Sequence, residues 1–350
     1  MKFKTLAFLI LIMSPFIMTT KGQFILAAPN TEKEYVILFD ESHGQYFNRT
    51  LMKSALSAIN DSLNVRFIFF NESKFNSTNL QGVDLVIIGN PGIYKNYNLS
   101  SEEVEVIQDY VEAGGSLFLL ANPLSSDTNI TGHVSSFNDI LSARLSKLSS
   151  ARFRTGLDKS STVIMDDYHN KYNNESFLSI VNYNTSDNEF LEKNKIFEQT
   201  SKVENLTVYS TAISFDRPEK ENAIGRTEIT SYALEKDGSI VQDMINGFLV
   251  WLFAKEIGNA RIVLSGSTIM FSDLIIYEDQ KFIDEEQNKE LWLNLINWLL
   301  HITPYEERNP IAMPFYALVL LALGFAAVVF VIALLLYSYK KQKKINIKIK

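Results

Sequence analysis

The sequence predicts an α/β fold, a doubly wound and mostly parallel sheet with a loop-rich insertion. Two observations predict it, and a third adds to it. Short, wholly apolar runs recur along the chain, which is typical of strands buried on both faces. Segments with helical spacing of apolar residues alternate with the first of these runs. A long uncharged run near the carboxyl end adds one predicted transmembrane helix outside the sheet.

The first half of the α/β domain is predicted over residues 29–127. Its strands are the apolar runs Tyr35–Phe39, Val65–Phe70, Leu85–Ile88 and Ser116–Ala121. Helical spacing predicts one helix over Phe47–Ile59 and a second helix with Ser101 as its N-cap. Glu102 and Glu103 favour the second helix, because acidic side chains stabilise the positive end of a helix. Strands that alternate with helices are expected to run parallel.

Residues 128–207 are polar, rich in Asn and Ser and poorly periodic, so this region is predicted to be a loop-rich insertion beside the sheet. Residues 208–300 form the predicted second half of the domain. Its elements are strands at Val208–Phe215, Ile229–Leu234 and Ala260–Ser265 and an amphipathic helix at Lys289–Leu300. Residues 243–255 alternate too little to be assigned.

The two ends of the chain predict a single-pass type I membrane protein. Residues 1–28 have the charged start and short apolar core of a signal peptide, and an uncleaved N-terminal anchor is the alternative. The run at residues 315–337 is long enough to span a bilayer, and a buried core helix is the alternative. Residues 338–350 form a lysine-rich tail that is expected in the cytoplasm. The domain, followed by a juxtamembrane linker at 301–314, is then expected at the cell surface or in an internal lumen.

The charge of the chain argues against nucleic-acid binding. The chain has 33 Lys and Arg against 40 Asp and Glu, a net charge of −7, and nine of the basic residues lie in its two ends. The remainder is therefore strongly acidic and repels nucleic acid. The sequence has no cysteine, which excludes disulfides, thiolate metal sites and a cysteine nucleophile.

Nine Asn-x-Ser/Thr triplets make asparagine glycosylation a candidate modification, and all nine fall in the segment expected outside the cytoplasm. A chain rich in Asn and Ser also forms such triplets by composition alone, so each single site stays open. The candidate residues are Asn48, Asn60, Asn71, Asn76, Asn98, Asn129, Asn174, Asn184 and Asn205.

Polar residues at the carboxyl ends of the strands are the first candidates for a functional site, because ligands of such sheets bind at that edge. Asp40, Glu41 and His43 could form a metal or acid–base cluster, or could cap the turn after the first strand. Asp166, Asp167 and His169 form a second such group, for which solvated loop residues are the alternative. No phosphate-binding glycine motif follows any strand, and we assign no catalytic residue, cofactor or metal.

One segment resembles a known family. The run from Asn259 to Asp273, with its Ser-Gly-Ser and Phe-Ser-Asp steps, is similar to the luminal domain of the 48 kDa subunit of the eukaryotic oligosaccharyltransferase. Its motif residues are Ser265, Gly266, Ser267, Phe271, Ser272 and Asp273. Weaker matches extend from Tyr35 to Leu300. The first 90 residues also resemble the amidotransferase-like domains of intraflagellar transport and ABC-exporter accessory proteins, which implies an amidotransferase-like or flavodoxin-like form of the sheet.

The resemblance implies a non-catalytic accessory subunit of a membrane oligosaccharyltransferase complex that supports protein N-linked glycosylation. The implied partners are the multi-span catalytic subunit, other membrane subunits and the lipid bilayer. The motif residues would then be structural or make subunit contacts. The eukaryotic subunit also has a second, β-rich luminal domain, for which the short linker leaves no room. An accessory or ligand-binding component of an ABC exporter or surface assembly is the alternative.

A membrane-anchored hydrolase is a third hypothesis. Ser265 with His43 or His169 and an acid would make a triad, although Ser265 lacks the Gly-x-Ser-x-Gly elbow. A cysteine amidase of the amidotransferase kind is excluded, because the sequence contains no cysteine.

Overall fold

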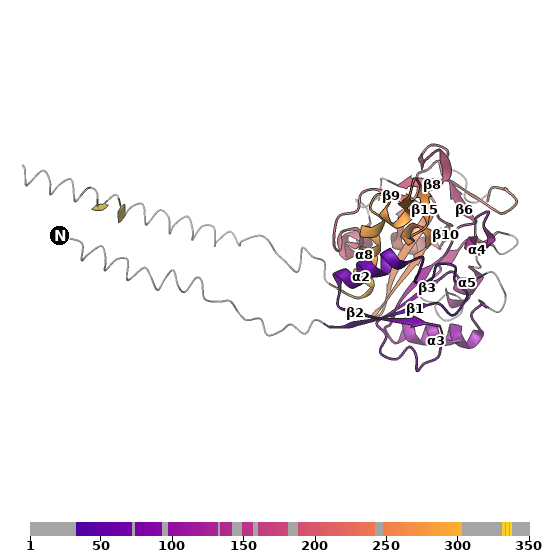
Figure 1. The fold of residues 1–350 in the computed structure, drawn as a ribbon, viewed down its shortest axis with the longest axis horizontal. Helices are drawn as coiled ribbons and strands as arrows, with labels where there is room; N and C mark the ends of the chain where they lie inside the picture. Colours follow the sequence, from indigo (N-terminus) through magenta and orange to yellow (C-terminus); the bar gives the residue numbers. More distant parts are fainter. Residues whose placement is uncertain are drawn as a thin grey trace, which may run out of the picture.

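Figure 1 shows the course of the chain in the computed structural model. The structure describes residues 33–71, 74–92, 97–131, 134–141, 149–156, 160–180, 188–241 and 248–302, and five residues between 331 and 337. The predicted signal peptide, the lysine-rich tail and all but the first two residues of the predicted linker lie outside the described residues.

Five strands of the nine-stranded main sheet run parallel, in the order β2-β1-β3-β4-β14. They are β1 (Tyr35–Asp40), β2 (Val65–Phe70), β3 (Leu85–Gly89), β4 (Ser116–Leu120) and β14 (Ala260–Ser265). Each lies within one residue of an apolar run in the sequence. The residues of β3 and β4 are buried throughout, because helices cover both faces of these strands.

The other four strands are antiparallel to their neighbours, so the predicted doubly wound, mostly parallel sheet is wrong. They are β13 (Val250–Ile257), β10 (Ile213–Ser214), β5 (Arg152–Phe153) and β11 (Ala223–Arg226). The result is a mixed sheet that forms a half-barrel.

Most of the antiparallel strands of the main sheet are missed by the sequence pattern for a physical reason, and β10 is marked only as part of the longer predicted strand Val208–Phe215. β13 is buried from Val250 to Ala254, so it shows no alternation of polar and apolar residues. β5 and β10 have two residues each, which is too short for any periodicity. The predicted strand Val208–Phe215 is divided, because β9 (Leu206–Val208) pairs with β8 (Asn174–Ile180) in a separate sheet.

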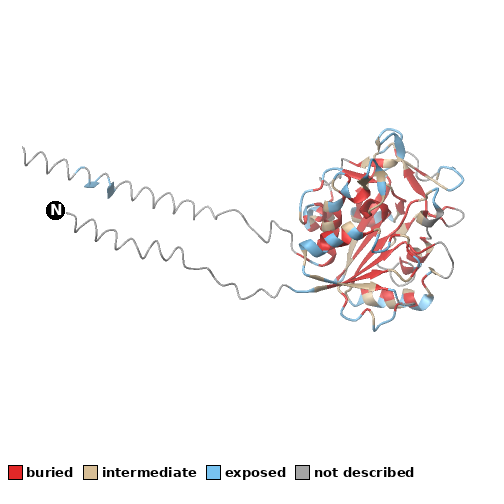
Figure 2. Cartoon of the chain, in the orientation of Figure 1, coloured by how far each residue is buried: buried red, intermediate tan, exposed pale blue. Residues whose placement is uncertain are grey.

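Helices pack on both faces of the parallel strands (Figure 1). α2 (Lys53–Ser62) and α8 (Asn288–Leu299) cover one face, and α3 (Ser101–Glu112) and α5 (Ser135–Leu141) cover the other. Alternate residues of β1 point to opposite faces and belong to two separate cores, with Ile37 in one and Leu38 in the other. Figure 2 shows that buried residues run along the strands of the sheet.

Two helix starts differ from the prediction. α2 begins at Lys53, because Phe47 belongs to the turns that precede it. The N-cap of α3 is Ser100 and not Ser101. Ser100 Oγ accepts from Glu103 N at 3.4 Å, and Ser100 N donates to Glu103 Oε2 at 2.9 Å. This reciprocal capping box is encoded by the spacing Ser-x-x-Glu.

The predicted loop-rich insertion contains short elements. They are α4 (Thr128–Thr131), α5, β5, β6 (Val163–Met165), β7 (Asn170–Lys171), β8, α7 (Glu189–Asn194), η2 (Ile196–Glu198) and β9. β6 pairs with β12 (Tyr232–Leu234), and β7, β8 and β9 form a three-stranded sheet. The later short elements are η3 (Arg217–Asn222), η5 (Ile269–Phe271), β15 (Ile275–Tyr277), β16 (Gln280–Lys281) and η6 (Phe282–Asp284).

No helix in the described part of the chain is long and apolar enough to cross a membrane. This finding contradicts the predicted single-pass membrane protein with its domain outside and its tail in the cytoplasm. Of the predicted span at residues 315–337, five residues are described, and the others lie outside the described residues.

Candidate functional site

The chain itself fills the carboxyl edge of the parallel strands, where the sequence predicts a site. Leu124 N donates to Thr162 O at 3.0 Å, and Thr211 N donates to Gly266 O at 2.9 Å. Thr162 and Thr211 are fully buried, and their hydroxyl oxygens lie 2.9 Å apart. The edge that holds ligands in open α/β sheets is therefore occupied by protein at these positions.

The hydroxyl groups of the motif that follows β14 are buried and bonded within the chain. Ser265 Oγ donates to Ser267 O at 2.9 Å, and Ser272 Oγ donates to a carbonyl of η5 at 2.7 Å. Thr268 Oγ1 donates to Leu120 O at 2.9 Å, which joins this segment to the end of β4. Ser265 is fully buried, and within the described residues no hydrogen bond joins it to a histidine.

Gly266 lies where two backbone segments come into close contact. A Cβ atom at this position would stand 2.1 Å from Thr211 O and 2.3 Å from Ser210 Oγ. Gly266 N also donates to Trp251 O at 2.8 Å, so the segment is fixed from both sides. Glycine is required here for space.

Phe271, also in the motif, belongs to the core, since its ring centroid lies 5.0 Å from that of Trp292.

Asp273 connects the end of the motif to the start of α2. Its carboxylate accepts hydrogen bonds from Ser54 N at 2.9 Å and from the Ser54 hydroxyl, and it pairs with Lys281 Nζ at 2.8 Å. Burial raises the pKa of Asp273, but the bonds from Lys281 and Ser54 outweigh burial and hold the pKa below its ordinary value. The motif is thus built into the fold over its whole length.

Asp40 and His43 come together at the end of β1, and Glu103 from α3 joins them. His43 Nδ1 lies 2.8 Å from Asp40 Oδ2, and His43 Nε2 lies 3.1 Å from Glu103 Oε1. All three side chains are buried. Glu41 points elsewhere and accepts from Arg49 Nε at 2.7 Å. The predicted cluster of Asp40, Glu41 and His43 is therefore not formed.

The charges of this buried cluster support one another. Burial alone lowers the pKa of His43, but its hydrogen bonds to Asp40 and Glu103 outweigh burial and raise the pKa to about 9. Burial raises the pKa of Glu103, but the bonds from His43 and from the backbone of Ser100 and Phe75 bring it to about 2. His43 is thus a cation with both ring nitrogens occupied, which does not suit it to act as a base at neutral pH.

Asp166 and His169 also come together, in a turn at the surface. Asp166 is buried and accepts from His169 N at 2.9 Å, from Thr230 Oγ1 at 2.8 Å and from Ser231 Oγ at 2.9 Å. Burial raises the pKa of Asp166, but these bonds outweigh it and lower the pKa. Asp167 is exposed and accepts from a tyrosine hydroxyl. Within the described ranges, no group of three or more His, Asp or Glu side chains is arranged to hold a metal ion.

The candidate glycosylation residues lie at the surface wherever their side chains are described. The seven exposed residues are Asn48, Asn60, Asn71, Asn76, Asn98, Asn174 and Asn205. Asn184 and the side chain of Asn129 lie outside the described residues. Exposure is what attachment of a glycan needs, and modification of any one site stays a prediction.

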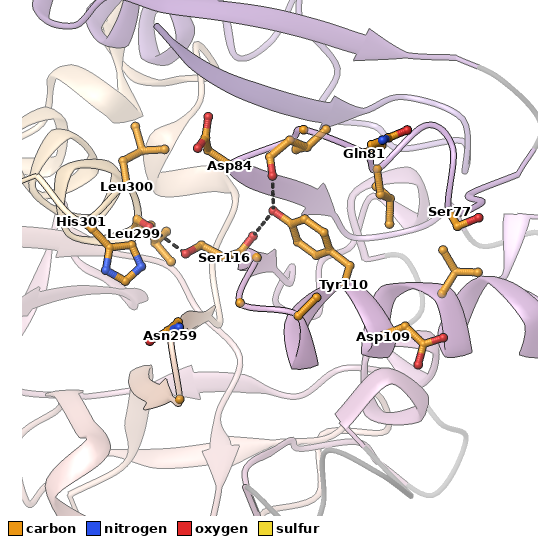
Figure 3. Close-up of a pocket in the computed structure, with 18 of the residues that line it drawn as sticks. Ser77, Gln81, Asp84, Asp109, Tyr110, Ser116, Asn259, Leu299, Leu300 and His301 are labelled. Atoms are coloured by element: carbon orange, nitrogen blue, oxygen red, sulfur yellow. Dashed lines mark hydrogen bonds between the residues drawn. The ribbon is translucent and has the colours of Figure 1, made fainter. Parts of the chain in front are cut away.

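A groove of about 920 Å³ lies at the opposite, amino end of the parallel strands (Figure 3). Its walls are α3, the loops before β3, β4 and β14, the residue Lys33 ahead of β1, and the end of α8. The labelled lining residues are Ser77, Gln81, Asp84, Asp109, Tyr110, Ser116, Asn259, Leu299, Leu300 and His301. This volume lies within the range of ligand sites in proteins. We name this cavity the amino-edge groove.

Tyr110 forms a rigid part of the groove wall. Its hydroxyl donates to Ser116 O at 3.2 Å, and Ser116 Oγ donates to Leu299 O at 2.7 Å (Figure 3). A Cβ atom at Gly115 would lie 2.2 Å from the Tyr110 ring, so this glycine lets the ring lie against the backbone. In the sequence, the glycines at 114–115 indicate only the end of a helix, and nothing in the pattern marks the groove beside them.

No protein-family model matches the sequence, and no curated protein matches it. Similar solved structures include the N-terminal domain of mmIFT52, with 17% identity and a TM-score of 0.48, covering 75% of this chain and 96% of that chain. A putative ThuA-like protein from Bacteroides uniformis has 12% identity and a TM-score of 0.39, with coverage of 76% and 91%. Cytoplasmic protein STM3548 from Salmonella typhimurium has 14% identity and a TM-score of 0.39, with coverage of 77% and 99%. Because all three TM-scores are below 0.5, we transfer no property of these proteins to the chain.

Proposed function

We propose that the chain is a non-catalytic accessory subunit of an oligosaccharyltransferase complex that supports protein N-linked glycosylation. One observation carries the proposal. The hydroxyl groups of the motif Ser265–Asp273, which resembles the 48 kDa subunit, are bonded inside the chain. A motif used in this way builds the domain and presents no nucleophile. The likeness then concerns how the domain is built, which suits a subunit whose role is contact with other proteins.

The amino-edge groove is the surface that we assign to the multi-span catalytic partner. It is concave, and it combines partly exposed apolar side chains at Val106 and Tyr110 with polar groups at Gln81 and Asn259. Protein interfaces of moderate size have this mixture of apolar centre and polar rim. The ion pair between Lys33 Nζ and Asp84 Oδ1, at 2.7 Å, borders it.

Co-purification tests the proposal. The tagged full chain is recovered from host membranes dissolved in a mild detergent, and the proteins that accompany it are identified by mass spectrometry. We expect a multi-span glycosyltransferase in comparable amount. Gln81→Trp and Asn259→Trp, which place a bulky ring in the groove, should lower its recovery at least fivefold. Asp61→Trp on the exposed face of α2 is the matched control and should leave recovery unchanged.

Two results would contradict the proposal. Recovery of the chain without any multi-span glycosyltransferase, in a detergent that keeps such complexes intact, would remove it. Recovery with an ATPase and a permease would favour the alternative, an accessory component of an ABC exporter. If the glycosyltransferase is recovered equally with the groove variants, the subunit role survives but the groove is not the contact.

A further inference from the structure

The tips of two hairpins lie side by side on the part of the domain that carries β8 and β15 (Figure 1). The β7–β8 turn has Tyr172 and Asn173 at its centre, and the β15–β16 turn has Glu278 and Asp279. All four residues have positive φ angles, between 43° and 67°. The rings of Tyr172 and Tyr277 stack with their centroids 4.9 Å apart, which holds the two hairpins together.

The aromatic residues of these tips are exposed although they are fixed in place. Tyr172 is 42% exposed, Tyr277 is 49% exposed, and Ile275 beside them is 63% exposed. The Tyr172 hydroxyl donates to Glu285 Oε1 at 2.7 Å, so its ring cannot turn freely. A tyrosine in the left-handed backbone region costs on the order of 1–3 kcal/mol, and asparagine or glycine would fit such a turn better. The stack on Tyr277 and the hydrogen bond to Glu285 offset this cost and hold the Tyr172 ring at the surface.

Acidic side chains surround the exposed rings. Glu278, Asp279, Asp284 and Glu286 are all exposed. Two lysines belong to these hairpins, and both are already paired. Lys171 pairs with Glu285 at 3.2 Å and with Glu286, and Lys281, which lies opposite Ile275, pairs with Asp273 at 2.8 Å. The tips therefore present an aromatic and aliphatic patch with an excess of negative charge. We name Tyr172, Ile275, Tyr277, Glu278 and Asp279 the hairpin surface.

We propose that the hairpin surface binds a basic segment of a partner protein, in which lysine or arginine alternates with apolar residues. Cationic side chains can lie over the tyrosine rings and pair with the flanking carboxylates. The negative charge of the hairpin surface favours a basic ligand. Its carboxylates would repel an anionic partner, and they would add little to the binding of a neutral saccharide. The surface does not include any residue of the amino-edge groove, so this proposal is independent of the proposed function.

Binding of defined probes to the purified full chain tests this proposal. The probe is a fluorescent nonapeptide in which lysine alternates with leucine, measured by anisotropy against a matched peptide with glutamate in place of lysine. We expect the basic peptide to bind at least tenfold more tightly. Tyr277→Ala should weaken its binding about fivefold or more, whereas Tyr277→Phe should keep it within twofold, because the ring face is what the cation contacts. The double variant Glu278→Gln/Asp279→Asn should weaken binding about fivefold and flatten its salt dependence.

A control variant separates the hairpin surface from general acidity. Asp61→Asn/Glu105→Gln removes the same charge from the exposed faces of α2 and α3, and should change binding less than twofold. The proposal is wrong if this control weakens binding as much as the hairpin variant, or if both peptides bind equally. It is also wrong if the basic peptide does not bind, while a neutral chito-oligosaccharide binds to the wild-type chain and loses its affinity in Tyr277→Ala. Thermal unfolding of every variant shows that each one is folded.

Discussion

His43 and Glu103 are 60 positions apart in the sequence, yet His43 Nε2 lies 3.1 Å from Glu103 Oε1 in the interior. The pair joins the end of β1 to the first turn of α3. Glu103 also accepts from Phe75 N at 2.9 Å, which fixes the loop after β2 to the same carboxylate. One buried charge cluster thus connects three consecutive parts of the first half of the domain.

This cluster predicts that stability falls as the pH rises above neutrality. The pKa of His43 is about 9 in the folded chain, against the ordinary histidine value of 6.5 that holds when the chain is unfolded. A raised pKa contributes stability that is fully present below pH 6.5 and is lost as the pH approaches 9. The shift corresponds to about 3 kcal/mol of unfolding free energy. Urea unfolding between pH 6.5 and 9.5 measures it.

Substitution of the histidine separates this effect from other titrations. His43→Gln leaves Asp40 and Glu103 buried without their cation, and should cost about 3–5 kcal/mol at pH 7. The same variant should lose most of the pH dependence between 6.5 and 9. His169→Gln is the control, since this histidine is half-exposed at the surface. A wild-type chain whose stability is constant over this range would contradict the raised pKa.

The parallel strands could be read from the sequence, whereas the antiparallel strands of the main sheet could be read only at β10, which lies inside the predicted strand Val208–Phe215. β3 and β4 are continuous apolar runs because they are covered on both faces. β5 and β10 are two residues long, which is too short for a local pattern to give their bounds. The change from parallel to antiparallel occurs at β13, which forms a hairpin with β14 through the turn at Gly258 and Asn259. Its pairing is local, but its burial from Val250 to Ala254 removes the alternation that would mark it as a strand.

The candidate site was predicted in part. Asp40 and His43 do meet, but the third member of their cluster is Glu103 and not Glu41. The spacing of Ser100 and Glu103 identifies a capping box, yet only the tertiary packing of α3 shows that the same carboxylate reaches His43. Sequence spacing alone gives no distance between segments this far apart.

Gly266→Ala should destabilise the fold by about 3 kcal/mol or more. The added methyl group would meet Thr211 O at 2.1 Å, and a backbone carbonyl cannot rotate away as a side chain can. Gly258→Ala is the comparison, because Gly258 has φ +58° but a Cβ added there would have no atom within 4 Å. That variant should lose only about 1 kcal/mol, from backbone conformation. Equal losses in urea unfolding would show that space at Gly266 is not limiting.

Ser265→Ala should lower stability without removing any activity. The variant loses the hydrogen bond to Ser267 O and leaves that buried carbonyl without its donor, at a cost of about 1–3 kcal/mol. Ser57→Ala on the exposed face of α2 is the control and should change stability by less than about 0.5 kcal/mol. An esterase activity of the purified chain that disappears in Ser265→Ala, with unfolding unchanged, would restore the hydrolase hypothesis.

Asp273→Asn should cost stability at neutral pH and cost much less in acid. The carboxylate accepts from Ser54 and pairs with Lys281, and its pKa is lowered from 3.8 in the folded chain. A lowered pKa contributes stability that is present above pH 3.8 and is lost as the pH falls through the folded value. We expect Asp273→Asn to lose about 1–3 kcal/mol at pH 7, with the difference from wild type shrinking as the pH falls below 3.8. Asp61→Asn, at an exposed position of α2, is the control, and its free energy of unfolding in urea should match that of wild type at every pH. If the difference in unfolding free energy between Asp273→Asn and wild type is the same at every pH, the carboxylate is not its cause.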